Sequence, residues 1–232
     1  MRGMKLIGLS LLLAAGSASA QISSTVTLTS DYDFRAISLS AKDPALQASV
    51  DWAHDSGFYL GAWASNIDYG DADGDVELDL YLGIGGGAED GLGWDVGLVY
   101  YTYPGSNDIN EYPEIWAGLS YGMFALKQWY TNDYVGADVD SYYTEGNVNI
   151  ELPADFTLSL HAGYNYGDAF EDSEYVDYSV GVGYTLGHFD LELKYIDTNL
   201  DDTDAFFSSD DVFNTEGRAI LSVSTTFPWG SE

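Results

Sequence analysis

The chain contains no cysteine, so it forms no disulfide and offers no thiolate to a metal ion. It has only 7 lysine and arginine residues against 38 aspartate and glutamate residues, which gives a formal net charge of −31. Nucleic-acid binding requires a basic surface, and this composition excludes it. Hydrophobic residues make up 46% and aromatic residues 15%, too much for a disordered acidic chain. The acidic residues must therefore lie on an ordered, apolar-rich scaffold.

Long apolar runs are also missing. Beyond the N-terminus no segment approaches the roughly 18 apolar residues that indicate a membrane-spanning helix. At the N-terminus, Arg2 and Lys5 precede a short apolar run, and Ala18-Ser19-Ala20 follows it. This order is typical of a cleaved secretory signal peptide, with a buried N-terminal helix as the alternative. We predict a signal peptide over residues 1–20 and a single domain over residues 21–232.

The remaining chain alternates apolar and polar residues almost from end to end, which indicates β-strands. In the segment VELDLYLGI, Val76, Leu78 and Leu80 alternate with Glu77 and Asp79. Because successive side chains of a strand point to opposite faces, one face is apolar and the other carries carboxylates. We count about twelve strands. The clearer ones cover residues 25–34, 46–52, 76–84, 92–100, 156–166, 176–186, 189–195 and 221–227, and the weaker ones cover 57–66, 112–121, 123–132 and 142–152.

The connections between these strands alternate in length. Those after even-numbered strands are short, whereas those after odd-numbered strands are longer and acidic. The long ones are 36–44, 68–75, 104–114, 132–140, 167–174 and 197–216. An outer-membrane β-barrel has this asymmetry, with short periplasmic turns and long external loops. A soluble β-sandwich is the alternative, but its loop lengths have no reason to alternate with strand number. The sequence therefore favours an all-β, antiparallel transmembrane β-barrel in the outer membrane of a Gram-negative cell.

Aromatic residues near the strand ends are expected to form the girdles of such a barrel at the membrane interfaces. They are Trp52, Tyr59, Tyr100, Tyr101, Tyr103, Tyr130 and Tyr195. Glycines on the inner face are expected to widen the lumen, which twelve strands make broader than that of an eight-stranded barrel. These glycines are Gly93, Gly97, Gly163, Gly181 and Gly183.

The lumen itself is expected to be lined by charged residues, and carboxylates along a pore concentrate cations and repel anions. The lumen-facing candidates are Asp51, Glu77, Asp79, Asp95, Asp177, Asp190, Glu192, Lys194 and Arg218. They predict a porin-like channel for passive diffusion of small hydrophilic solutes, with a preference for cations. Arg35, Lys194 and Arg218 are three of the five basic residues that follow the signal peptide. They either pair with nearby carboxylates such as Glu192 or form a charge ladder across the lumen.

The sequence gives little support to an enzyme or a metal site. The three histidines, His54, His161 and His188, are scattered, and Ser159 and His161 point in parallel on one strand face. No Gly-x-Ser-x-Gly turn occurs, so we predict no catalytic residue and no cofactor.

One acidic loop resembles the start of a calcium-binding loop. Asp71, Asp73 and Asp75 alternate as calcium ligands do, but the glycine and glutamate that complete an EF-hand loop are missing. These three residues are therefore weak metal candidates, and a solvated acidic loop is the favoured interpretation.

The segment from Leu28 to Tyr69 resembles the bacterial TorF-type porin family of the outer membrane. The pieces that carry the resemblance include TSDY, FR, IS, GFY and WASN. The motif residues in this chain are Asp31, Tyr32, Phe34, Arg35, Ser38, Gly57, Phe58, Tyr59, Trp63, Ser65 and Asn66. The family usually has Arg-Gly-Ile-Ser where this chain has Arg35-Ala36-Ile37-Ser38, which affects a local turn. The resemblance implies an outer-membrane barrel and a pore, and it implies neither a substrate nor catalytic residues.

Two other functions remain open. In the first, the barrel is sealed and serves as a structural or surface-binding protein, whose acidic loops bind divalent cations, lipopolysaccharide or a protein. Alternatively, the chain is a secreted acidic β-sandwich that binds sugars. The expected partners of the favoured barrel are membrane lipid, lipopolysaccharide and small hydrophilic solutes or cations, and a homo-oligomer is left open.

Overall fold

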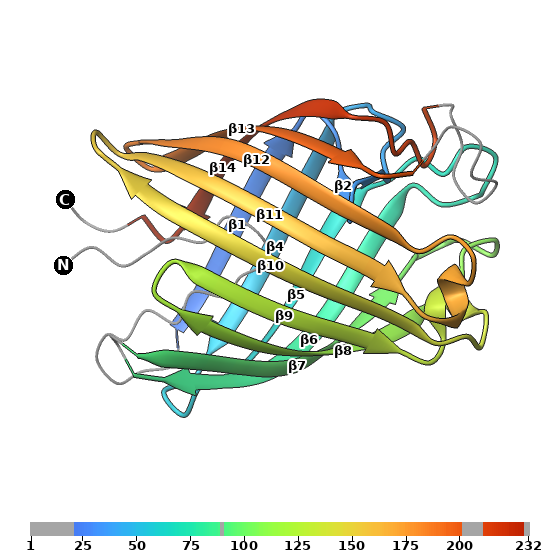
Figure 1. Cartoon of the computed structure of the whole chain (residues 1–232), viewed down its shortest axis with the longest axis horizontal. Helices are drawn as coiled ribbons and strands as arrows, with labels where there is room; N and C mark the ends of the chain where they lie inside the picture. Colours follow the sequence, from blue (N-terminus) through green and yellow to red (C-terminus); the bar gives the residue numbers. More distant parts are fainter. Residues whose placement is uncertain (1–20, 89–90, 201–210, 230–232) are drawn as a thin grey trace.

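Twelve strands form a closed antiparallel barrel in the computed structural model, which describes residues 21–88, 91–200 and 211–229 (Figure 1). The strands are β1 (Gln21–Thr29), β4 (Ala45–Ala53), β5 (Phe58–Asn66), β6 (Val76–Gly87), β7 (Leu92–Thr102), β8 (Tyr112–Tyr121), β9 (Phe124–Thr131), β10 (Ser141–Leu152), β11 (Phe156–Tyr166), β12 (Tyr175–Leu186), β13 (Phe189–Thr198) and β14 (Arg218–Phe227). Each strand pairs with its neighbours in the chain, and β1 pairs with β14 to close the barrel. The predicted fold class is confirmed.

The two ends of the barrel differ as the loop lengths predict. Tight turns join the strands at the end where β1 begins and β14 ends, and longer connections lie at the opposite end (Figure 1). We call these the short-turn end and the long-loop end. Two 3₁₀ turns, η1 (Tyr134–Gly136) and η2 (Asp168–Phe170), lie in the long connections. The predicted signal peptide and the middle of the predicted loop 197–216 lie outside the described residues.

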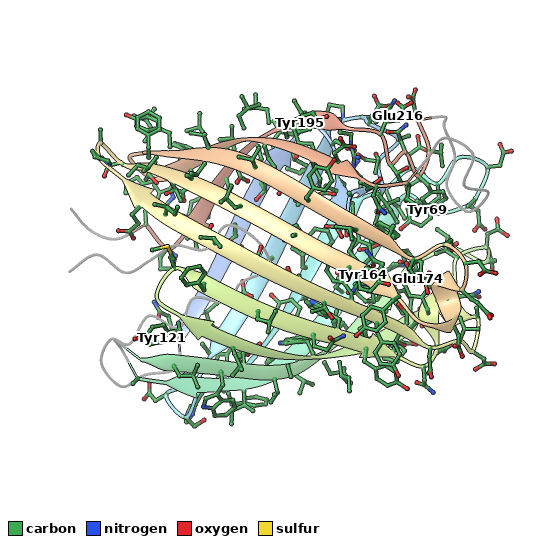
Figure 2. The ribbon with its side chains drawn as sticks, in the orientation of Figure 1. Tyr69, Tyr121, Tyr164, Glu174, Tyr195 and Glu216 are labelled. Atoms are coloured by element: carbon green, nitrogen blue, oxygen red, sulfur yellow. The ribbon has the colours of Figure 1, made fainter. Side chains whose placement is uncertain are left out.

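The outer face of the barrel is apolar and the inner face is polar. On β6, Leu80 and Leu82 are 49% and 48% exposed, whereas Glu77 and Asp79 on the opposite face are 1% and 4% exposed. Large apolar side chains are exposed in the same way on every strand of the barrel wall (Figure 2). This pattern is typical of a barrel that is surrounded by lipid and closed so that no strand edge is left unpaired. Within the described residues, no helix is both long enough and apolar enough to cross a membrane.

The first predicted strand is too long. It was expected over residues 25–34, but β1 ends at Thr29, and residues 30–44 turn into the lumen as a segment that we call the inner loop. This loop carries the small hairpin of β2 (Asp33–Phe34) and β3 (Ile37–Ser38). Its apolar residues Tyr32, Ile37 and Leu39 are almost fully buried. The alternation of Asp31 to Phe34 continues that of β1, so the pattern alone does not reveal where the strand ends.

The tip of the inner loop is a tight turn with two residues of positive φ. Arg35 has φ 52° and Ala36 has φ 65°, as in the two-residue turns that favour Asn-Gly. The backbone N–H of Ala36 donates a hydrogen bond to Oδ1 of Asp33, 2.9 Å away. Ala36 is fully buried, so this position admits only a very small side chain. The turn explains why glycine is expected here and why alanine is the nearest substitute.

Two expectations about the lumen are wrong. Tyr59, Tyr101 and Tyr103 are buried inside the barrel and are not part of an interfacial girdle. Two of the five predicted inner glycines, Gly97 and Gly163, do not leave open space either, because rings from neighbouring strands fill it. A Cβ on Gly97 would meet the ring of Trp116, and a Cβ on Gly163 would meet the ring of Tyr143; Gly61 and Gly83 make the same room for Tyr81 and Tyr59. Each of these glycines allows an inward aromatic side chain to lie flat against the wall.

Candidate functional site

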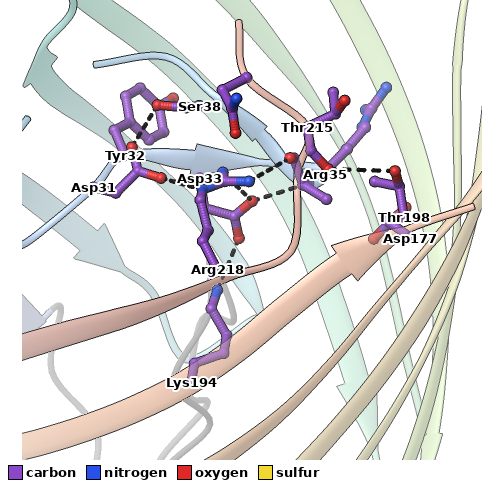
Figure 3. Close-up of polar contacts among 12 residues, drawn as sticks. Asp31, Tyr32, Asp33, Arg35, Ser38, Asp177, Lys194, Thr198, Thr215 and Arg218 are labelled. Carbon is purple, nitrogen blue, oxygen red and sulfur yellow. Dashed lines mark hydrogen bonds and ion pairs between the residues drawn. The ribbon is translucent and has the colours of Figure 1, made fainter. Parts of the chain in front are cut away.

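The inner loop is held to the last two strands by buried ion pairs (Figure 3). Arg218 Nε lies 2.5 Å from Oδ2 of Asp31, and its Nη1 donates to the carbonyl oxygen of Ala36 at 2.9 Å. Lys194 Nζ lies 2.8 Å from Oδ2 of Asp33. Asp31, Asp33 and Arg218 are each mostly buried, so these pairs lie largely out of water. One face of the hairpin is therefore fixed to β13 and β14.

At the tip of the loop, Arg35 reaches the opposite wall. Its Nη2 lies 2.6 Å from Oε2 of Glu114 on β8. Its guanidinium carbon lies 4.4 Å from the ring centre of Tyr143 on β10 and 5.9 Å from that of Trp129 on β9. Both distances are within the range of cation–π attraction. The hydroxyl of Tyr175 on β12 donates to the carbonyl oxygen of Arg35 at 3.1 Å. The loop thus spans the lumen from one wall to the other.

Hydrogen bonds from uncharged donors complete the attachment of the inner loop. Tyr32 donates its hydroxyl to Oε1 of Glu77 at 2.6 Å, and its ring packs on that of Trp63 with centroids 5.2 Å apart. Ser38 donates to Oδ1 of Asp31 at 2.5 Å, and its backbone N–H donates to the carbonyl oxygen of Asn214 at 2.9 Å. Asn214 follows the undescribed part of the last long connection, so that connection also contacts the inner loop.

The environment of the loop shifts the pKa values of its own groups. Burial tends to raise the pKa of the Asp33 carboxyl, but Lys194 and then Arg218 outweigh it, and the pKa lies below the ordinary value of 3.8. Burial and the nearby Glu77 carboxylate raise the pKa of the Tyr32 hydroxyl well above 10.0. Asp33 is therefore held as an anion and Tyr32 as a neutral donor, which are the states that their contacts require.

The three basic residues that stood out in the sequence are all used by this loop. Arg35 belongs to it, and Lys194 and Arg218 bind two of its three aspartates, Asp33 and Asp31. The direct partner of Lys194 is Asp33 and not the expected Glu192, which instead accepts a hydrogen bond from Ser159 Oγ at 3.0 Å. The basic residues therefore do pair with carboxylates, but with carboxylates that a distant segment brings to them.

The inner face from β4 to β12 combines aromatic rings with carboxylates, and of these carboxylates Glu114 is paired with Arg35. Each ring donates an O–H or N–H to a carboxylate of the inner face. We call this surface the aromatic–carboxylate wall. Its pairs are Tyr59 with Asp95, Tyr81 with Asp51, Tyr101 with Glu114, Trp116 with Asp95, Trp129 with Glu145, and Tyr143 with Asp177. Such pairs keep the acids oriented without cancelling their charge.

Sequence reasoning missed the aromatic–carboxylate wall. Tyr59 and Tyr101 were predicted to lie in interfacial girdles, and Trp116 was not among the predicted inward residues. An inward aromatic residue beside a glycine on the neighbouring strand is a signal that locates two of them, Trp116 beside Gly97 and Tyr59 beside Gly83.

The lumen-facing candidates all lie on the inner face, at two depths. Glu77, Asp79 and Asp177 lie toward the long-loop end and are almost fully buried. The remaining acidic candidates lie toward the short-turn end and are half-buried; they are Asp51, Asp95, Asp190 and Glu192. Oδ1 of Asp79 has no hydrogen-bond partner in the structure, and neither has Nη1 of Arg35. The long-loop half of the lumen is therefore packed, while solvent contacts the acids of the short-turn half.

The weak metal candidates are used in a different way. Asp73 accepts hydrogen bonds from Ser106 Oγ at 2.9 Å and from the backbone N–H of Asn107 at 2.8 Å. These donors, the side chain of Asn107 first among them, lower the pKa of Asp73 well below 3.8. Asp73 thus joins two long-loop connections to each other. Within the described residues, no group of three or more histidine or acidic side chains is arranged to hold a metal ion.

The serine and histidine of β11 have separate partners. His161 Nε2 lies 2.8 Å from Oδ1 of Asp177, and its Nδ1 lies 2.8 Å from Oδ1 of Asn147. Ser159 bonds Glu192 instead of His161. The arrangement is that of polar contacts along an inner wall.

The motif residues form two structures that contact each other. Asp31, Tyr32, Phe34, Arg35 and Ser38 build the inner loop, and Gly57 to Asn66 build the turn and strand β5 beneath it. Gly57 has φ 85°, and its carbonyl oxygen accepts the N–H of Gly85 at 3.0 Å. Asn66 accepts the N–H of Leu46 through Oδ1 at 2.7 Å and donates to the carbonyl oxygen of Pro44 at 3.3 Å, where the inner loop ends. Of the other strand residues, Tyr59, Trp63 and Ser65 point inward and Phe58 points outward.

Comparison with known proteins places this barrel in a family. Residues 13–227 match a family described as "Bacterial protein of unknown function (Gcw_chp)", and the chain belongs to it. This match includes the segment that resembles TorF-type porins, but its description carries no porin name. A search of the curated proteins gives no match.

Solved structures with a similar fold are porins. The KdgM porin has 10% sequence identity and a TM-score of 0.54, and the match covers 90% of this chain and all of that one (100%). The NanC porin has 9% identity and a TM-score of 0.55, with the same coverage of 90% and 100%. The KdgM porin has also been solved in complex with disordered oligogalacturonate. At these identities the likeness concerns the fold.

Proposed function

We propose that the protein is an outer-membrane channel for passive diffusion of small hydrophilic solutes, with a preference for cations and a lumen that the inner loop narrows. The carrying observation is the inner face of the barrel, where Asp51, Asp95, Asp190 and Glu192 lie half-buried and accessible from the short-turn end. A barrel that serves only as an anchor has no need for charged residues inside, because an apolar filling is more stable. Carboxylates in a narrow passage with low-dielectric walls raise the local concentration of cations.

The charge of the lumen argues against the solute of the similar KdgM structure. Oligogalacturonate is a polyanion, and three of the basic residues that would attract one are engaged here: Arg35 with Glu114, Lys194 with Asp33, and Arg218 with Asp31. The fold is shared, but the inner face favours solutes of the opposite charge.

A sealed barrel is the second candidate, and one observation favours it. The inner loop is almost fully buried at Tyr32, Ile37 and Leu39 and spans the lumen between β14 and β8. In that case the acidic residues of the long connections, such as Glu174 and Glu216 at the edge of Figure 2, would bind divalent cations, lipopolysaccharide or another protein. A homo-oligomer is compatible with either function.

Ion conductance of the refolded protein, residues 21–232, in a planar bilayer under a salt gradient distinguishes the two. We expect discrete current steps and a cation-selective reversal potential, and we expect Asp51→Asn with Asp95→Asn to reduce this selectivity. Folding is checked by the shift between heated and unheated samples on SDS gels. A correctly folded protein that never conducts, even when residues 31–42 are replaced by a short glycine-serine linker, would refute the channel.

A further inference from the structure

The contact between Arg35 and the barrel wall is a contact between two separable parts of the chain. Arg35 lies at the tip of the inner loop, whereas Glu114, Trp129 and Tyr143 belong to three adjacent strands of the wall. The strands are fixed by their backbone ladder and do not depend on the loop. The guanidinium is therefore in the position of a ligand, held by a surface that exists without it.

This surface has the chemistry of a receptor for organic cations. Glu114 supplies a carboxylate 2.6 Å from the guanidinium, and the hydroxyl of Tyr101 orients that carboxylate from 3.0 Å. The rings of Tyr143 and Trp129 cover the guanidinium from the wall side. A planar cation that is held by one carboxylate and by aromatic faces is recognised by charge and by shape together.

The internal cation leaves part of this site unused. Within the described residues, Nη1 of Arg35 is buried without a hydrogen-bond partner, and so is Oδ1 of Asp79 on the same wall. Asp79 stands directly beside Tyr101 in the β6–β7 pairing, and Asp79 is only 4% exposed. A buried carboxylate oxygen without a donor is costly, so a ligand that supplies a further N–H gains from binding here.

A second cation lies on the same wall, toward the short-turn end. Lys127 Nζ lies 5.0 Å from the ring centre of Trp129 and 5.4 Å from that of Trp116. The wall thus carries two cationic groups in succession, Arg35 and Lys127, that share the ring of Trp129. A metal ion is a poorer candidate, because no described cluster offers it three suitable ligands.

We infer that Glu114, Trp129 and Tyr143 form a binding site for solutes with a guanidinium or primary ammonium group, and that Arg35 occupies this site as an internal substitute. The inference rests on the proposed function, because it names the class of solute that would enter the lumen, although binding by itself does not require conduction. When the inner loop moves away, the solute takes the place of Arg35 along the wall.

Arg35→Ala vacates the site and is the variant to test. Calorimetry in detergent compares L-arginine amide with L-citrulline amide, which has the same skeleton but a neutral ureido group. We expect Arg35→Ala to bind arginine amide at least about tenfold more tightly than citrulline amide, because a charge-assisted hydrogen bond supplies that difference. Adding Glu114→Gln to Arg35→Ala should remove the preference for arginine amide. Adding Trp129→Leu to Arg35→Ala should weaken this preference, and this second double variant is the test if the first does not fold.

The controls separate this inference from the proposed channel. Equal binding of both amides by folded Arg35→Ala, or a preference that persists without Glu114, overturns the site. If that variant conducts ions but does not discriminate between the amides, the channel stands and the site falls. If it discriminates in calorimetry but never conducts, the site stands and the channel falls.

Discussion

Removing Arg218 should release the inner loop from the barrel wall without opening the barrel. Among the described residues, Arg218 is the only cation in direct contact with Asp31, whereas Asp33 keeps Lys194. The side chains of Arg218 and Asp31 are 10% and 5% exposed, so Arg218→Met leaves a buried carboxylate without a counter-charge. Removing one partner of a buried pair costs about 3–5 kcal/mol. Because Ser38 still donates to Asp31, we take the lower end of this range.

A loss of about 3 kcal/mol raises the population of the undocked loop roughly a hundredfold. The chain has no cysteine, so a single thiol at Ile37→Cys reports this opening on a clean background. Ile37 is buried when the loop is docked, and a charged maleimide reacts with the thiol only when the loop is undocked. The labelling rate should therefore rise roughly a hundredfold in Arg218→Met, while the heat-shift on SDS gels stays that of a folded barrel.

Lys42→Met is the matched control, because it removes a cation of the same loop from a solvent-exposed pair. Lys42 Nζ lies 2.6 Å from Asp211, but the two side chains are 34% and 70% exposed. Such pairs contribute at most about 1 kcal/mol, so labelling should change by no more than about fivefold. If Arg218→Met labels no faster than this control, the ion pairs do not hold the loop and the reasoning is wrong.

Three further predictions concern the turn, the barrel wall and pH. Ala36→Gly should slow labelling of the same thiol by up to about fivefold, because glycine adopts φ 65° without the strain of a Cβ, which costs about 1 kcal/mol. Gly57→Ala should lower the unfolding temperature measured by heat-shift on SDS gels, because Gly57 has a φ of 85° and a Cβ there would overlap the carbonyl oxygen of Gly85. Gly146→Ala is the control and should change the unfolding temperature little, because a Cβ on Gly146 would meet open space. The pKa of Asp33 lies below 3.8 in the docked loop, so docking is stable above that pH and is lost as pH falls further; bilayer conductance should therefore rise below about pH 4.

The strands and their closure could be predicted because their signal is local. Alternation marks each strand, and the unequal loops mark the two ends of the barrel. The inner loop could not be predicted in the same way, because Asp31 to Phe34 alternate like a strand and their partners are remote. Lys194 is 161 positions from Asp33 in the chain, and Arg218 is 187 positions from Asp31. No local pattern contains such a pairing.

The candidate site was predictable in its charges but not in its organisation. The inner acids follow from strand parity, as for Glu77 and Asp79. Their partners do not, because Tyr59 next to Phe58 and Tyr101 next to Tyr100 leave the inward residue ambiguous when both neighbours are aromatic. For Tyr59 the next strand supplies the missing signal, because Gly83 leaves room for its ring.

The position of the inner loop also bears on the order in which the barrel assembles. The loop follows β1 directly, and its ion-pair partners lie on β13 and β14, the last strands to be made. The backbone N–H of Ser30 donates to the carbonyl oxygen of Leu221 at 2.8 Å, beside the junction where β14 closes onto β1. Until β13 and β14 have been made, Asp31 and Asp33 therefore have no basic residue with which to form a buried ion pair. Docking of the loop can only follow the arrival of the final hairpin, and the loop then fastens the first strand to the last two from the inside.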